Sequence, residues 1–159
     1  MPDESHRLRP DHHPTPFSAE QIRDAFMPGR IVRSEVVVGG EAPTVRVRRD
    51  VRADADAGVY AMSTEGPDGE TIEAPEEGAS TWLELQGHAS MPIETTTIEP
   101  VTVDVPMGRF EGLLYTRVDG DVVDRFWFAT ARPGAPLRME RRVGGELVYS
   151  STAIEERGP

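Results

Sequence analysis

Most of the chain alternates apolar and polar residues with a period of two, a pattern typical of β-strands that expose one face. Residues 44–52 show it most clearly, since Val45, Val47 and Val51 alternate with arginines and Asp50. Glycine-rich and proline-rich turn sequences separate such stretches. We predict about nine strands at a spacing of about 8 to 15 residues, which favours an antiparallel meander. The predicted strands are 30–38, 44–52, 58–64, 81–86, 95–105, 109–118, 122–130, 137–143 and 146–155, and the acidic stretch 71–78 is predicted as a loop.

One segment has helical periodicity. Ser18 followed by Gln21 forms a capping-box pattern, and apolar residues then recur at helical spacing as far as Phe26. Met27, Pro28 and Gly29 end the pattern, and Phe17 is placed to act as a hydrophobic staple. The sequence therefore predicts a single short helix over residues 19–26.

These elements together predict a mainly β fold. A long meander with one helix buries its inner face by closing into a barrel or by curling around the helix. We therefore expect a curved antiparallel meander, a half-barrel or open barrel, wrapped on one short N-terminal helix. Residues 1–16 are polar and contain four prolines, which predicts a flexible N-terminal arm, and residues 17–157 are predicted to form one domain.

Composition excludes several classes of function. The 159 residues contain no cysteine, which excludes disulfides, cysteine-ligated metal sites and a thiol nucleophile. The net charge of -11 argues against general binding to nucleic acid. No apolar run reaches the roughly 18 to 20 residues needed to span a membrane. The N-terminus lacks the pattern of a secretion signal, so we expect a cytoplasmic protein.

The negative charge is concentrated in the middle third of the chain. Between Arg52 and Arg109 there are about 12 acidic residues and no Lys or Arg. One explanation is that acidic strands lie beside arginine-rich strands and pair with them across the sheet. The other is that the acids form a surface for a basic partner.

The last third resembles a known architecture. Its motifs are Met107-Gly108-Arg109-Phe110-Glu111, Phe126-Trp127-Phe128-Ala129, the segment from Pro133 to Glu140, and Gly144-Gly145-Glu146-Leu147-Val148. Over about residues 101–155 this pattern resembles the closing hairpins of LolA-like and related half-barrel domains of unknown function. The resemblance implies a curved sheet wrapped on a helix, with a concave apolar face that receives acyl chains in the best-known members. Those members are exported, so their carrier role does not extend to a chain without an export signal.

Large side chains on the predicted strands are candidates for the lining of such a cavity: Trp82, Met107, Tyr115, Trp127 and Met139. The alternative is that they are ordinary core residues, because aromatic side chains in apolar strands normally pack together. Arg117 is a candidate for holding a ligand carboxylate at the mouth of the cavity. Its alternative role is a cross-strand ion pair with an acidic residue such as Asp124.

Few residues suggest catalysis or metal binding. His88 follows Gly87 in a predicted loop near Ser90 and is a candidate general base, and Asp124 is a second candidate catalytic group. His12 and His13 lie in the proline-rich arm, where adjacent histidines seldom form a closed metal site. We predict no metal and no cofactor.

Three hypotheses about function follow. The first is non-enzymatic binding of a small hydrophobic or acyl ligand in a concave β-sheet cavity. The second is a small β-barrel enzyme that acts on a hydrophobic metabolite, with His88, Tyr115 and Asp124 as its residues. The third is a protein-interaction module that uses its acidic middle third or a sheet edge, and an open edge would also permit a homodimer.

Overall fold

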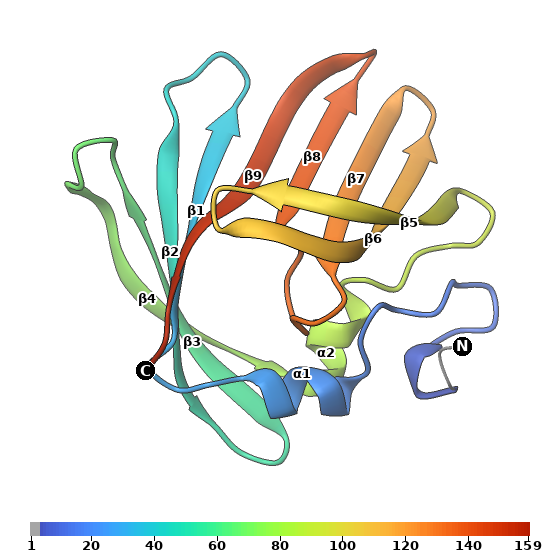
Figure 1. Ribbon diagram of the computed structural model, residues 1–159, viewed down its shortest axis with the longest axis horizontal. Helices are drawn as coiled ribbons and strands as arrows, with labels where there is room; N and C mark the ends of the chain where they lie inside the picture. Colours follow the sequence, from blue (N-terminus) through green and yellow to red (C-terminus); the bar gives the residue numbers. More distant parts are fainter. Residues whose placement is uncertain (1–3) are drawn as a thin grey trace.

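The computed structural model describes residues 4–159, which form one nine-stranded antiparallel sheet with the strand order β4-β3-β2-β1-β9-β8-β7-β6-β5. The sheet is strongly curved and open, because β4 and β5 are its two ends and do not pair with each other (Figure 1). The predicted curved, mainly β half-barrel is confirmed. The strands are β1 (Ile31–Val38), β2 (Thr44–Ala53), β3 (Ala57–Glu65), β4 (Thr71–Thr81), β5 (Thr96–Val105), β6 (Gly108–Asp119), β7 (Val122–Ala129), β8 (Arg138–Val143) and β9 (Glu146–Arg157).

At the centre of the sheet, the first strand along the sequence pairs with the last one. β1 pairs with β2 on one side and with β9 on the other, so Val36 lies opposite Ser151. Strands β1–β4 form one half of the sheet, which we call the wing, and β5–β9 form the other half, the body. Hairpins connect neighbouring strands within each half.

Two short helices, α1 (Ala19–Ala25) and α2 (Trp82–Gly87), cover one end of the concave side of the sheet, which we call the inner face (Figure 1). Phe26 after α1 and Trp82 of α2 pack edge to face with ring centroids 5.2 Å apart. They press against Gly58 of β3, where an added Cβ would lie 2.7 Å from the Trp82 ring. A larger residue at position 58 would therefore separate the helices from the wing. The main core consists of Phe17, Ile22, Phe26, Trp82, Met91, Tyr115 and Phe128.

A second apolar cluster forms where the outer half of the β5–β6 hairpin crosses in front of the other body strands (Figure 1). Val103 of β5 is buried there with Ala129, Leu137 and Ala153. β6 passes very close to β7 at Gly112, where a Cβ would lie 2.2 Å from the Phe128 carbonyl oxygen. Only glycine permits this approach. The hairpin thus fills the body side of the half-barrel.

Helix α1 agrees closely with the prediction. The Ser18 side chain accepts a hydrogen bond from the Gln21 backbone, and the Gln21 side chain accepts one from the Ser18 backbone. Phe17, the predicted staple residue, belongs to the same core cluster as Ile22 of the helix. The helix ends at Ala25 and Phe26 caps it.

Two predicted elements are wrong. Residues 81–86 were expected as a strand, but they form α2, because Thr81 and Glu84 build a second capping box. The Trp82 indole then donates to the Asp54 carbonyl oxygen at 3.0 Å, which fixes the helix on the wing. Residues 71–78 were expected as a loop, but they belong to edge strand β4. An exposed edge strand tolerates acidic residues on both of its faces, so it carries no apolar alternation.

The N-terminal segment lies against the body. It begins with a short 3-10 helix, η1 (Glu4–His6), and residues 11–13 run beside residues 91–93, where His13 and Met91 share a backbone hydrogen bond. Whether the segment moves in solution stays a prediction, and residues 1–3 lie outside the described part. None of the helices of residues 4–159 is long and apolar enough to cross a membrane.

Gln86 of α2 holds this segment in place. Its side chain is buried, donates to the Ser5 carbonyl oxygen at 2.7 Å and to Thr15 Oγ1 at 2.9 Å, and accepts from the Ala19 backbone at 2.9 Å. Thr15 is itself 1% exposed. One amide thus connects η1, the arm and α1 to α2.

We expect Gln86→Ala to lower the free energy of unfolding by about 2–3 kcal/mol, because three hydrogen bonds are lost and buried polar partners are left unsatisfied. Urea unfolding monitored by tryptophan fluorescence measures this change. Gln21→Ala is the control, since it removes one hydrogen bond at the surface and should cost about 0.5–1 kcal/mol. Equal losses in the two variants would show that Gln86 has no special role.

Candidate functional site

The structure places two of the predicted ligand residues, Trp82 and Tyr115, in the main core. The Tyr115 hydroxyl donates to the Pro14 carbonyl oxygen at 2.7 Å. Burial raises the pKa of Tyr115 above its ordinary value, so the hydroxyl stays protonated and keeps this bond. Both side chains are therefore core residues, which is the alternative to cavity lining that the sequence allowed.

Three other predicted residues, Met107, Trp127 and Met139, are half-buried on the body. Met107 and Trp127 pack against the second apolar cluster, and the Arg138 guanidinium lies 5.5 Å from the centre of a Trp127 ring. Met139 lies on the inner face opposite Ser151 and Phe126. The structure does not gather these residues around one cavity, and their role in ligand binding stays a prediction.

Arg117 is engaged in a cross-strand ion pair. It donates to Asp124 at 3.1 Å, and Arg141 donates to both oxygens of the same carboxylate at 2.7 and 3.0 Å. Burial alone would raise the pKa of Asp124, but the hydrogen bonds and charges of Arg141 and Arg117 outweigh it and lower the pKa below its ordinary value of 3.8. Asp124 therefore remains ionised and acts as an ionic cross-link between β6, β7 and β8.

The histidines make contacts other than those expected. His88 is exposed at the C-terminal end of α2. Ser90, its expected partner, instead bonds to His12 Nδ1 at 2.8 Å, and His13 Nε2 donates to the Thr96 carbonyl oxygen at 2.7 Å. His12 and His13 thereby attach the N-terminal arm to the body. Residues 4–159 contain no group of three or more His, Asp or Glu side chains arranged to hold a metal ion.

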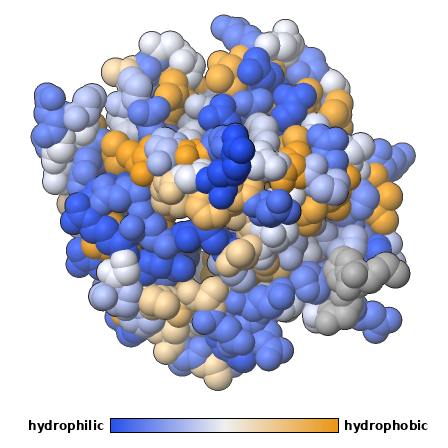
Figure 2. Space-filling model, in the orientation of Figure 1, coloured by the Kyte–Doolittle hydropathy of each residue, from blue (hydrophilic) through white to orange (hydrophobic). Residues whose placement is uncertain are grey.

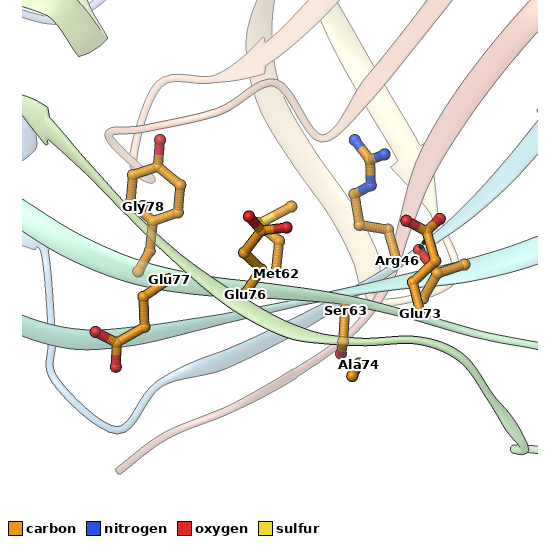
Figure 3. Close-up of a pocket in the computed structure, with 10 residues that line it drawn as sticks. Arg46, Met62, Ser63, Glu73, Ala74, Glu76, Glu77 and Gly78 are labelled. Atoms are coloured by element: carbon orange, nitrogen blue, oxygen red, sulfur yellow. Dashed lines mark hydrogen bonds between the residues drawn. The ribbon is translucent and has the colours of Figure 1, made fainter.

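The best candidate site lies on the inner face of the wing, away from the helices. It is an open pocket of about 310 Å³, and we call it the wing pocket. Figure 3 shows Arg46, Met62, Glu73 and Glu76 pointing to one side of the strands, whereas Glu77 points to the other. The pocket is lined by Arg46, Tyr60, Met62, Ser63, Thr64, Glu73, Ala74, Glu76, Glu77 and Gly78.

Register explains why these side chains meet. Met62 of β3 lies opposite Arg48 of β2 and Glu76 of β4, so the three share the inner face. Two residues further along β3, Thr64 lies opposite Arg46 and Glu73. Because side chains alternate along a strand, the pocket combines residues that are up to about 30 positions apart in the sequence.

The pocket has an apolar floor and a charged rim. Arg48 lies over the Tyr60 ring at 4.5 Å, and the Tyr60 hydroxyl shares a hydrogen bond with Ser80. Tyr60 and Met62 are half-buried. Within residues 4–159, Arg46 makes no ion pair, so its guanidinium is available to a ligand. Glu73 accepts from Thr64, and Glu76 supplies a further acceptor at the rim.

Sequence reasoning missed this site because it assigned residues 71–78 to a loop. Without β4 there is no wall beside Tyr60 and Met62. The arginine ladder of Arg46, Arg48, Arg49 and Arg52 was the available signal, since alternation sends Arg46 and Arg48 to one face and Arg49 to the other. A second open pocket, of about 430 Å³, lies between the N-terminal ends of α1 and α2 and includes Trp82.

The ion pairs of Asp124 make stability depend on acidity. Because the folded pKa lies below the unfolded value, the carboxylate stabilises the fold fully above about pH 5 and progressively less as the pH falls through about 3.8. We expect Asp124→Asn to lower the free energy of unfolding by about 1–3 kcal/mol at neutral pH, a range that allows for the part-exposed arginines.

This difference between Asp124→Asn and the natural sequence should shrink as the pH approaches about 3. Urea unfolding at a series of pH values measures it. Asp104→Asn is the matched control, because the Asp104–Arg109 pair is exposed and should contribute less than about 1 kcal/mol. A difference that stays constant with pH would contradict the role of the ionised Asp124.

Comparison with known proteins shows the fold alone. No protein-family model matches the chain, and no curated protein matches it. Among solved structures, MucB is similar at a TM-score of 0.55 and 12% identity over 87% of this chain, which spans 57% of the length of MucB. The hypothetical protein CT021 from Chlamydia trachomatis is similar at a TM-score of 0.50 and 10% identity, covering 89% of this chain and 93% of that one. These similarities support a β-rich half-barrel fold, and membership of a LolA-like family stays a prediction.

Proposed function

We propose that this chain is a non-enzymatic binding protein that holds a small amphipathic ligand in the wing pocket. The observation that carries the proposal is the unpaired Arg46 guanidinium beside the half-buried Tyr60 and Met62. Ligand sites commonly combine apolar walls with a few polar groups that fix orientation. The volume of about 310 Å³ is at the lower end for such sites, which favours a small ligand or one end of an acyl chain.

The arrangement of the fold supports this position for the ligand. The helices and the β5–β6 hairpin fill the inner face over the body, as the two core clusters show. The wing keeps an inner face that is only partly covered, and Figure 2 shows mostly hydrophilic residues on the surface where β3 and β4 lie. The pocket thus offers apolar contact and charge together near solvent.

The enzyme alternative receives no specific support from the contacts of the described residues. No hydrogen bond among them joins His88, Tyr115 and Asp124 to one another, since Tyr115 bonds to Pro14 and Asp124 to arginines. A cytoplasmic location also stays a prediction.

The proposal is tested by measuring how octanoate and octanol displace a fluorescent apolar probe from the protein. We expect saturable binding of both, with octanoate tighter because Arg46 can pair with its carboxylate. Arg46→Gln should weaken octanoate about tenfold and leave octanol unchanged, whereas Met62→Ser should weaken both.

Arg49→Gln is the matched control, because Arg49 lies on the opposite face of the same strand. It should leave both affinities unchanged. Absence of saturable binding, or an equal effect of Arg46→Gln and Arg49→Gln, would overturn the proposal.

A further inference from the structure

The free edge of β4 is a second surface with a recognisable chemistry. β4 pairs only with β3 among the described strands, and residues 71–77 are all exposed. Such an edge presents unpaired backbone N–H and C=O groups that can bind another extended chain. Pro75 lies at an irregularity in the pairing of β3 with β4, between the positions of Glu73 and Glu76. The regular part of the edge is therefore Glu76–Thr81.

Charge restricts what this edge can accept. Glu73, Glu76 and Glu77 project from β4, and Arg52 at 3.7 Å from Glu77 supplies the only ion pair of the strand within residues 4–159. β3 separates β4 from the arginine-rich strand β2 and has no basic residue, so few arginines reach the acidic side chains of β4. The carboxylates at the edge are thus largely uncompensated.

The same charges oppose pairing between two copies of this edge, because like charges placed opposite each other destabilise a strand pair. They favour an added strand with basic side chains. The edge would thus be selective in two ways, because it attracts a basic strand and repels a second acidic one. The edge is therefore better suited to a cationic segment than to a second copy of this chain.

A site for one cationic side chain exists next to the edge. Gly78 lies opposite Tyr60 and has no side chain, and a Cβ at position 78 would be 3.5 Å from the Tyr60 ring. An arginine or lysine on an added strand beside Gly78 can reach over this gap to the Tyr60 ring and to Glu76. Both contacts attract a cation.

From these observations we propose that the β4 edge over Glu76–Thr81 binds an extended cationic peptide segment as an added strand. The backbone of the edge supplies hydrogen bonds, and Glu76 and Glu77 select for positive charge on the two faces. This binding does not depend on a ligand in the wing pocket, although an added strand would extend the wall of that pocket.

An eight-residue peptide that repeats Arg-Arg-Val-Val, and so carries arginine on both faces of a strand, tests the proposal by fluorescence anisotropy at low and moderate salt. We expect binding that weakens as salt increases. The double variant Glu76→Lys and Glu77→Lys should weaken it at least tenfold and should bind the matching glutamate–valine peptide instead. The control is Glu94→Lys with Glu99→Lys, an equal change of charge near the opposite edge, which should retain most of the affinity.

Two further measurements separate strand addition from simple attraction of charge. A peptide of the same sequence with alternate amides N-methylated should bind at least tenfold more weakly, and the amides of residues 76–81 should exchange more slowly with the unmethylated peptide. Equal binding of the methylated peptide, or equal loss in the control variant, would overturn the proposal. Octanoate binding to the natural sequence, measured without any peptide, tests the wing pocket separately.

Discussion

A curved sheet must shield its inner face from water, and this chain has enough additional structure to cover only half of it. The two short helices and the β5–β6 hairpin are placed over the body, where Tyr115, Phe128 and Val103 become fully buried. The wing receives cover only at one end, through the contact of Trp82 with Gly58. The remaining inner face of the wing is amphipathic because it has to be stable beside solvent. The candidate site therefore lies where the helices and the β5–β6 hairpin leave the inner face uncovered.

Ion pairs replace apolar packing where the cover is thin. Asp50 is buried between Arg30 and Arg48 and accepts from the Met27 backbone, so it attaches the segment after α1 to β2. Asp124 has an equivalent position in the body between Arg117 and Arg141. All basic side chains except histidine are arginines, whose planar guanidinium groups can bond to a carboxylate and stack on an aromatic ring. Asp124 consequently joins β6, β7 and β8, and Asp50 joins β2 to the segment that follows α1.

Local signals in the sequence were sufficient to predict most elements. Features that depend on contacts between distant residues were not predicted. The capping box of Ser18 and Gln21 and the turn sequence Asp119-Gly120-Asp121 specify their structures through neighbouring residues, and both occur as expected. The segment around Trp82 was predicted as a strand although its Thr81–Glu84 capping box is a local helix signal, and the distant contacts of Trp82 with Asp54 and Phe26 hold the helix in place. β4 exists through its pairing with β3, which no local pattern reports. The wing pocket depends on that pairing, so it was not predictable from the candidate residues considered.

The pairing of β1 with β9 places the last strand of the chain at the centre of the sheet. During synthesis the hairpins of the wing and of the body can form as their residues become available, but no strand pairing joins the two halves until β9 is complete. Ile31 then meets Arg157, a contact that closes a loop of nearly the whole domain. Contacts of such large sequence separation slow folding, because the entropy of loop closure is lost before the pairing stabilises the fold. A nascent or truncated chain that lacks β9 would therefore expose the inner edges of both halves, β1 and β8, at the same time.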